Sequence, residues 1–100
     1  MITHVVLFKF SARADAEQAR ERLLGMRGQI EALLELEVGL DITRSPRSYD
    51  LALITRFADQ AGLDAYQEHP AHLPVLEFIR ARAEAVCAVD FVGERRSSAD

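Results

Sequence analysis

The first half of the chain alternates between strand-like and helix-like patterns of apolar residues. Residues 2–10, ITHVVLFKF, are rich in β-branched and aromatic residues and predict a strand. From 11 to 36, apolar residues recur at spacings of three and four, which predicts a helix. Gly25 and Gly28 lower helix stability by about 1 kcal/mol each, so we expect a bend there. Residues 35–45 alternate as a half-buried strand, in which Gly39 indicates a bulge or a close backbone approach.

The second half repeats the strand and helix patterns with clearer boundaries. Residues 48–57 predict a strand that forms a hairpin with the preceding one. A short helix is expected at 60–67, capped by Asp59. Pro70 disfavours helix at the residue before it, and Pro74 suits the first turn of a new helix, expected at 73–83. The last predicted strand is 85–92.

The resulting order is βαββαβ. With right-handed crossovers, it predicts an α+β, ferredoxin-like sandwich: a four-stranded antiparallel sheet with its helices on one face and the first strand in a central position. Residues 1–93 are expected to form one domain, and residues 94–100 a flexible polar tail.

Both faces of the predicted sheet are largely apolar. On the first strand, Val6 and Phe8 point to one side and Val5 and Leu7 to the other. An antiparallel sheet with one face in water should instead alternate cleanly. Helices of this number cover one face only, so we expect the other to pack against a second copy of the chain. The predicted assembly is a homodimer. The alternative is that loops and the tail fold across the open face.

Composition narrows the class of protein. The net charge is −4 and no large cluster of Lys and Arg is present, which argues against nucleic acid. No apolar run approaches the roughly 20 residues that span a bilayer, and the first residues are too short an apolar run for a secretory signal. Cys87 is the single cysteine, which excludes an internal disulfide and fits a reducing compartment. We expect a cytoplasmic protein without membrane contact.

Three residues are candidates for chemistry: His4, Tyr66 and His72. His72 lies at helical spacing from apolar residues that face the sheet, which aims it at the strand face that bears His4, and Tyr66 ends the preceding helix. In a cavity, a neutral imidazole would serve as general base and a phenol would stabilise a developing oxyanion. The alternative is a polar cluster whose members hydrogen-bond one another and fill the end of the core.

The remaining polar residues have simpler interpretations. His69 precedes Pro70 and is expected to cap or orient the bend. His69 and His72 are three apart, but the proline-broken backbone does not hold them on one helical face, so we predict no metal site and no cofactor. Three aspartates, Asp41, Asp50 and Asp90, flank strands and are expected to face solvent or pair with Arg44, Arg47 or Arg56. Cys87 is interpreted as an inert small apolar residue.

Five segments, in order, carry a family resemblance: ITHVVLFKF, LELEVGLDIT, YDLALITRF, LDAYQEHPAHLPV and VCAVDFV. The most specific feature is Tyr66 followed by HPAH (69–72), together with His4 early in the first strand. On these residues the chain resembles the stress-responsive α/β-barrel (Dabb) domain family over residues 2–92. The resemblance implies a ferredoxin-like protomer that forms a dimeric α+β barrel.

The family includes stress proteins and a plant polyketide cyclase that closes a ring by an aldol-type step without a cofactor. The resemblance implies that His72 would be the base, Tyr66 the oxyanion partner, and His4 part of the same pocket. In some relatives, main-chain carbonyls in the stretch matching 27–33 hold a cation. The leading hypothesis is therefore a dimeric barrel that binds an apolar or aromatic small molecule and promotes a proton transfer, cyclisation or lyase-type step. The alternative is a non-catalytic stress or scaffold protein with a structural histidine cluster.

Overall fold

The predicted order of strands and helices is present in the protein, described here from a computed structural model. The structure describes residues 1–93, and the expected polar tail, 94–100, lies outside the described residues. The elements are β1 (Ile2–Phe10), α1 (Arg13–Leu24), β2 (Glu35–Leu40), β3 (Leu51–Phe57), α2 (Gln60–Gln67), α3 (Leu73–Arg82) and β4 (Ala83–Val92). The ferredoxin-like fold is confirmed.

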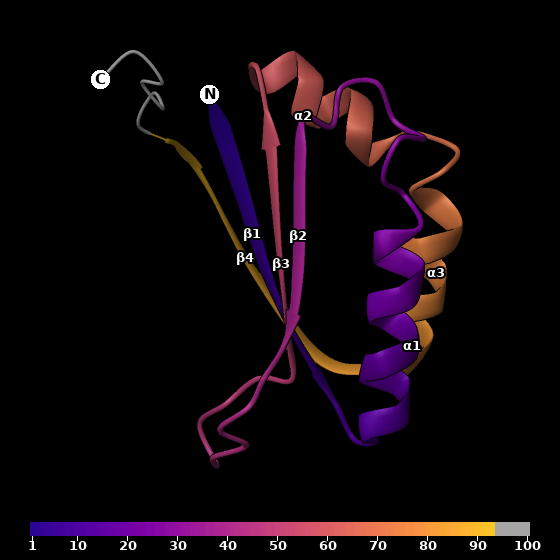
Figure 1. Ribbon diagram of the computed structural model, residues 1–100, viewed down its shortest axis with the longest axis vertical. Coiled ribbons are helices and arrows are strands. Elements are labelled where there is room, and N and C mark those ends of the chain that lie inside the picture. The colour runs from indigo at the N-terminus through magenta and orange to yellow at the C-terminus, as the bar shows by residue number, and fades with distance from the viewer. Residues whose placement is uncertain (94–100) are drawn as a thin grey trace.

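The four strands form one antiparallel sheet in the order β2-β3-β1-β4. β1 is central, as predicted, and β4 is an edge strand. Figure 1 shows α1 and α3 side by side over one face of the sheet, with α2 at the end where the chain begins. No helix of the described residues 1–93 lies over the other face (Figure 1). None of the helices within residues 1–93 has the length and apolar character needed to cross a bilayer.

The first helix is shorter than predicted. It ends at Leu24, and the backbone N–H of Gly25 bonds to the carbonyl of Glu21 at the C-terminal cap. Gly28 then adopts a φ of 80°, a left-handed conformation that non-glycine residues rarely take. The glycines therefore end the helix, where we had expected them only to bend it. Residues 25–34 form turns and lead to β2.

The remaining boundaries differ little from the prediction, except at the connection between β2 and β3. β2 stops at Leu40 and β3 starts at Leu51, so the connection between them is a ten-residue loop. Gly39 is not a bulge, because it pairs in regular register with Ala52. Nor does another backbone approach it, since a Cβ at Gly39 would meet no atom within 4 Å.

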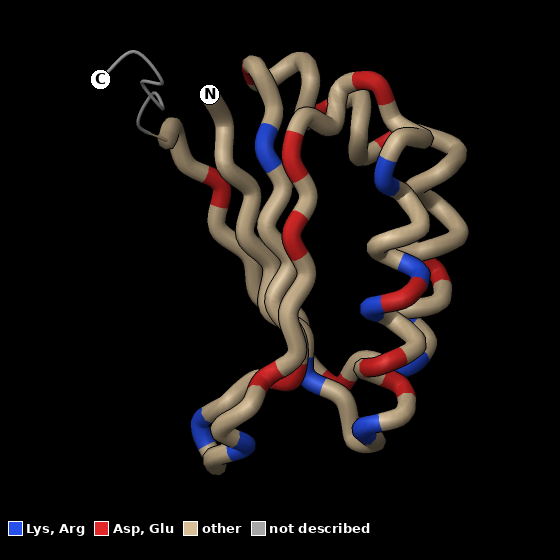
Figure 2. Tube along the Cα trace, viewed as in Figure 1, with Lys and Arg blue, Asp and Glu red and all other residues tan. Residues whose placement is uncertain are grey.

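The hydrophobic core lies between the sheet and the helices. The covered face of the sheet contributes residues that are at most 6% exposed: Val6, Phe8, Phe10, Leu51, Leu53 and Phe57. The open face is also apolar, and in the single chain Val89 and Phe91 are 55% and 47% exposed. Figure 2 shows few charges along the middle of β1 and β4, while most lie on the helices, on β2 and in the loops.

Candidate functional site

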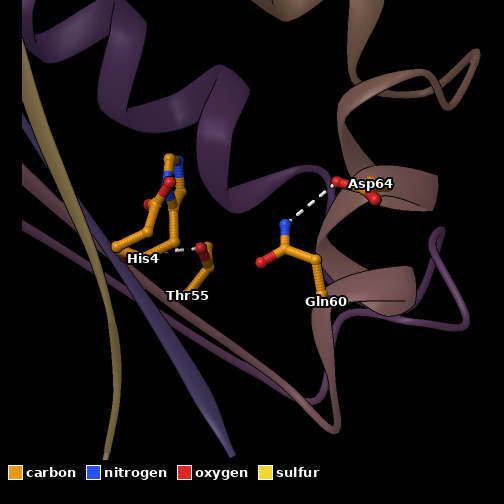
Figure 3. A network of polar contacts seen from close by, with 5 residues as sticks. His4, Thr55, Gln60 and Asp64 are labelled. Carbon is orange, nitrogen blue, oxygen red and sulfur yellow. Dashed lines mark hydrogen bonds and ion pairs between the residues drawn. The ribbon is translucent and has the colours of Figure 1, made fainter.

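Three aromatic side chains from three elements meet on the covered side of the sheet. His4 comes from β1, Tyr66 from the last turn of α2, and His72 from the residue that precedes α3. The ring centroids of Tyr66 and His72 are 4.4 Å apart, and those of His4 and Tyr66 are 6.2 Å apart. Figure 3 shows His4 with Thr55 beside it, and the Thr55 hydroxyl donates to the His4 carbonyl at 3.5 Å.

The bend between α2 and α3 brings Tyr66 and His72 together. Asp59 caps α2 as predicted, since its carboxylate accepts the backbone N–H of Gly62 at 2.9 Å. Figure 3 also shows the hydrogen bond between Gln60 and Asp64, at 3.1 Å, on the exposed side of this helix. After α2, the chain turns through 68–72 and restarts as α3 with a proline in the first turn. This reversal places residues on either side of Pro70 in ring contact.

His72 is held as a neutral imidazole with one free nitrogen. Its Nδ1 lies 3.1 Å from the Gln67 carbonyl oxygen. A carbonyl oxygen can only accept, so Nδ1 carries the proton and Nε2 keeps its lone pair. Burial lowers the pKa of His72 below its ordinary value of 6.5, and the charges of His4 and Arg80 act in the same direction. The contact with Gln67 opposes these effects without reversing them.

Tyr66 is buried with an unsatisfied hydroxyl. The side chain is 1% exposed, and its ring packs against Phe57 with centroids 5.0 Å apart. The hydroxyl has no hydrogen-bond partner among residues 1–93. A buried polar group in this state costs about 1–3 kcal/mol. Burial also raises the pKa of the Tyr66 phenol, so the group stays protonated at neutral pH and remains a hydrogen-bond donor.

Asp90 is a fourth member of the cluster that the sequence analysis missed. It is the direct neighbour of His4 in the β1–β4 register, and its carboxylate pairs with His4 Nδ1. Asp90 is exposed, as expected, but its partner is His4 and not an arginine. The pairing follows from strand register, because residues directly opposite each other in an antiparallel ladder point to the same face. The alternating pattern of β4 placed Asp90 on the face of Ala88, but only the register aligns it with His4.

A cavity of about 350 Å³ adjoins the cluster. Its polar end contains His4, Tyr66, His72 and Asp90, while its walls are mostly apolar. The wall residues are Val6, Phe8, Leu23, Leu53, Gln67, Val75, Leu76, Ile79, Arg80, Val86 and Ala88. This size falls in the range of small-molecule sites. The cluster thus lines a cavity at the edge of the core, and the hydroxyl of Tyr66 has no hydrogen-bond partner among residues 1–93.

The other histidine has a structural contact. His69 Nδ1 accepts the backbone N–H of Ala71 at 3.0 Å, which stabilises the bend as predicted. His69 lies in a separate hollow of about 510 Å³ between 30–34 and α2. Within residues 1–93, no group of three or more His, Cys, Asp or Glu side chains is placed to hold a metal ion.

The two other aspartates bind backbone near the ends of strands. Asp50 accepts the backbone N–H of Phe10 at 2.7 Å, and Asp41 accepts that of Arg44. Of the arginines that we expected as partners, Arg56 pairs instead with Glu35, at 3.5 Å. Cys87 is exposed on the open face of β4 in the single chain.

The fold and the site define a small α+β protein with a ferredoxin-like topology and a histidine-lined cavity under its helices. The chain belongs to the stress-responsive A/B barrel domain (Dabb) family, whose sequence profile matches residues 2–93. An uncharacterised protein of Streptomyces coelicolor is 36% identical over 77 residues, which cover 72% of this chain and 79% of the relative.

Solved structures with similar folds include proteins of unknown function and enzymes. A dimeric ferredoxin-like protein of unknown function from Thermobifida fusca is 28% identical, with a TM-score of 0.81 over 90% of this chain and 88% of that chain. A hydroxynitrile lyase from Passiflora edulis is 12% identical, with a TM-score of 0.79 and 96% of each chain covered. At this identity the lyase shows a shared fold alone.

Proposed function

We propose that the protein binds a small apolar or aromatic molecule in the 350 Å³ cavity and catalyses a proton transfer on it without a cofactor. The observation that carries this proposal is the Tyr66 hydroxyl, which is buried beside the cavity without a partner among residues 1–93. An oxygen atom of a bound ligand would satisfy it. The expected reaction class is proton abstraction next to a carbonyl, as in an aldol-type cyclisation, or a lyase step.

The residues have distinct roles in this reaction. His72 Nε2 has the free lone pair and removes a proton from the substrate carbon, since its Nδ1 is held by Gln67. Tyr66 donates its O–H to the substrate oxygen, on which negative charge grows as the proton leaves. His4 lines the same space, and Asp90 orients the His4 ring through Nδ1 so that Nε2 faces away from the carboxylate. Proton exchange with solvent would return His72 to its neutral form.

We further propose that two copies of the chain pack through their open sheet faces. The apolar side chains of that face, Val5, Leu7, Ile54, Val89 and Phe91, would become buried on association. Covering them would remove a patch that single soluble proteins rarely expose. The Thermobifida fusca relative is a dimer, which supports the proposal for this chain.

Deuterium exchange into a simple ketone tests the catalytic role. Phenylacetone in D2O would exchange its benzylic protons faster with the wild-type protein than in buffer, as measured by NMR. His72→Ala would lose about 100-fold of this acceleration because the base is gone. Tyr66→Phe would also lose it, while stability would be unchanged or higher, since the variant removes an unsatisfied hydroxyl.

The matched control is His69→Asn, which removes an imidazole outside the cavity and retains an oxygen that accepts from Ala71. It should exchange at the wild-type rate. The competing function is a non-catalytic scaffold with a structural cluster. In that case the wild-type protein would not accelerate exchange, and His72→Ala would lower the free energy of unfolding by about 1–3 kcal/mol.

A further inference from the structure

The cavity has a second polar feature at the end opposite the cluster. His72, Leu76 and Arg80 all line the cavity and lie at i, i+4 and i+8 along α3, so they form one stripe on the helix. At 1.5 Å per residue, His72 and Arg80 are about 12 Å apart along the helix axis. One stripe of α3 therefore contacts the cavity from the reactive histidine to a guanidinium.

The facing strand, β4, lines the same cavity along its length. Asp90, Ala88 and Val86 line the cavity from alternate positions of β4 and span about 13 Å. α3 ends at Arg82 and β4 begins at Ala83, so the chain reverses without a loop between them. Arg80 and Val86 therefore lie at one end of the cavity, while His72 and Asp90 lie at the other.

Arg80 differs from its neighbour Arg82 in its contacts. Arg82 donates to the Phe78 carbonyl at 3.3 Å, stacks on the Phe78 ring and lies 3.9 Å from the Asp15 carboxylate. Within residues 1–93, no carboxylate lies within ion-pair distance of Arg80. The other charged group on the cavity wall, Asp90, is paired with His4. Arg80 is thus the cation available to a ligand at this end.

We propose that Arg80 binds a carboxylate at one end of the ligand, while the reacting carbon and oxygen lie between His72 and Tyr66 at the other. This inference rests on the proposed function and adds a substrate class: a small, mostly apolar molecule, such as an aromatic or short-chain acid, with a carboxylate remote from its reactive carbon. A guanidinium fits a carboxylate with two parallel hydrogen bonds. A single arginine among apolar walls suits a monoanion better than a phosphate, whose higher charge favours several cations.

The electrostatics of the cavity agree with this placement. The Arg80 charge is one of the causes that lower the pKa of His72, so its field reaches the reactive end. A bound carboxylate would partly neutralise that charge. It would also leave the middle of the ligand against apolar side chains of the wall, including Leu76 and Val86. The cavity would therefore select ligands by the distance between their reactive and anionic ends.

A matched pair of probes tests the inference: naphthalene-2-acetic acid and its neutral analogue naphthalene-2-acetamide, titrated by calorimetry at pH 7.5. The wild-type protein should bind the acid about 10-fold more tightly than the amide. Arg80→Gln should lose this preference while binding the amide as before. Arg82→Gln, which removes a cation from the same helix end but outside the cavity, should keep it. Salt at 0.5 M (about a 4 Å screening length) should narrow the preference in the wild-type protein.

Each other result overturns a defined part of the argument. Equal binding of acid and amide by the wild-type protein, or an acid preference that survives in Arg80→Gln, would refute the role of Arg80 and leave the binding function intact. Loss of the preference in Arg82→Gln as well would show a general charge effect and refute a specific contact. If neither probe binds the wild-type protein, the proposed binding function fails, and the substrate class fails with it.

Discussion

The two faces of the sheet are similarly apolar, but they differ in how they are covered. One face packs against α1, α2 and α3 and buries a continuous core that includes Phe8, Leu53 and Phe57. The other has no helix from the described part of the chain over it and leaves Val89 and Phe91 about half exposed. Alternation within each strand produced both faces, so apolar character alone does not separate a core from an association surface.

The covered face is also incompletely filled, and the gap is where the polar cluster lies. β4 is exposed along most of its length on both sides, because the helices pack mainly over the other strands. The space between α3 and β4 remains as the cavity. One face therefore holds the core and the proposed binding site, whereas the other is the proposed surface for a second copy.

The largest expected effect is a loss of stability, which should be greater for a residue of the covered core than for one on the outer surface of the helices. Phe57→Ala would remove a fully buried ring under Tyr66 and lower the free energy of unfolding by about 3–5 kcal/mol. Phe78→Ala is the control, since Phe78 is partly buried between Arg22 and Arg82 on the helices. It should cost about 1 kcal/mol. Urea unfolding measures both, and equal losses would contradict the assignment of the core.

The next prediction concerns the open face. Val89→Glu would place a charge where the proposed dimer buries an apolar side chain, and should raise the dissociation constant of the dimer by at least about 100-fold. Val92→Glu is the control, because Val92 lies on the same strand but points to the opposite face and is 78% exposed. Light scattering over a concentration series gives the mass. A wild-type protein that is monomeric at micromolar concentration would refute the dimer itself.

Strand and helix periodicity was sufficient to predict the fold, because apolar spacing encodes which face of each element is buried. It failed at the end of α1, where Leu33 and Ile30 continue the helical spacing although Gly25 and Gly28 end the helix. Apolar residues after the helix still pack into the core from turns, and Ile30 is 3% exposed. The spacing of apolar residues therefore indicates which residues are buried, but a buried residue need not lie in a helix.

The candidate site was predicted only in part, because spacing shows which residues face the core but not which ones meet. His4, Tyr66 and His72 could be aimed at one space from periodicity, family resemblance and the two prolines. Asp90 required the register between β1 and β4, which a single sequence does not specify, and the role of Arg80 required the shape of the cavity. The unsatisfied hydroxyl of Tyr66 is a property of packing in three dimensions. A buried phenol would ordinarily have a hydrogen-bond partner.

The smallest expected effect is on the pH dependence of stability, which should differ between the buried His72 and His69 at the bend. The pKa of His72 is lowered in the folded protein, mainly by burial, so the unfolded chain binds the proton more readily. The stabilisation contributed by neutral His72 is then complete above the ordinary value of 6.5 and is lost as the pH falls from there toward the lowered pKa. In His72→Gln this loss should be absent, so the difference in unfolding free energy between wild type and His72→Gln should shift against the wild-type protein between pH 7.5 and 5. His69→Asn, measured in the same way, should keep the pH dependence that His72 contributes in the wild-type protein. A pH-independent difference for His72→Gln would mean that His72 is not desolvated, and the neutral base of the proposed reaction would lose its physical basis.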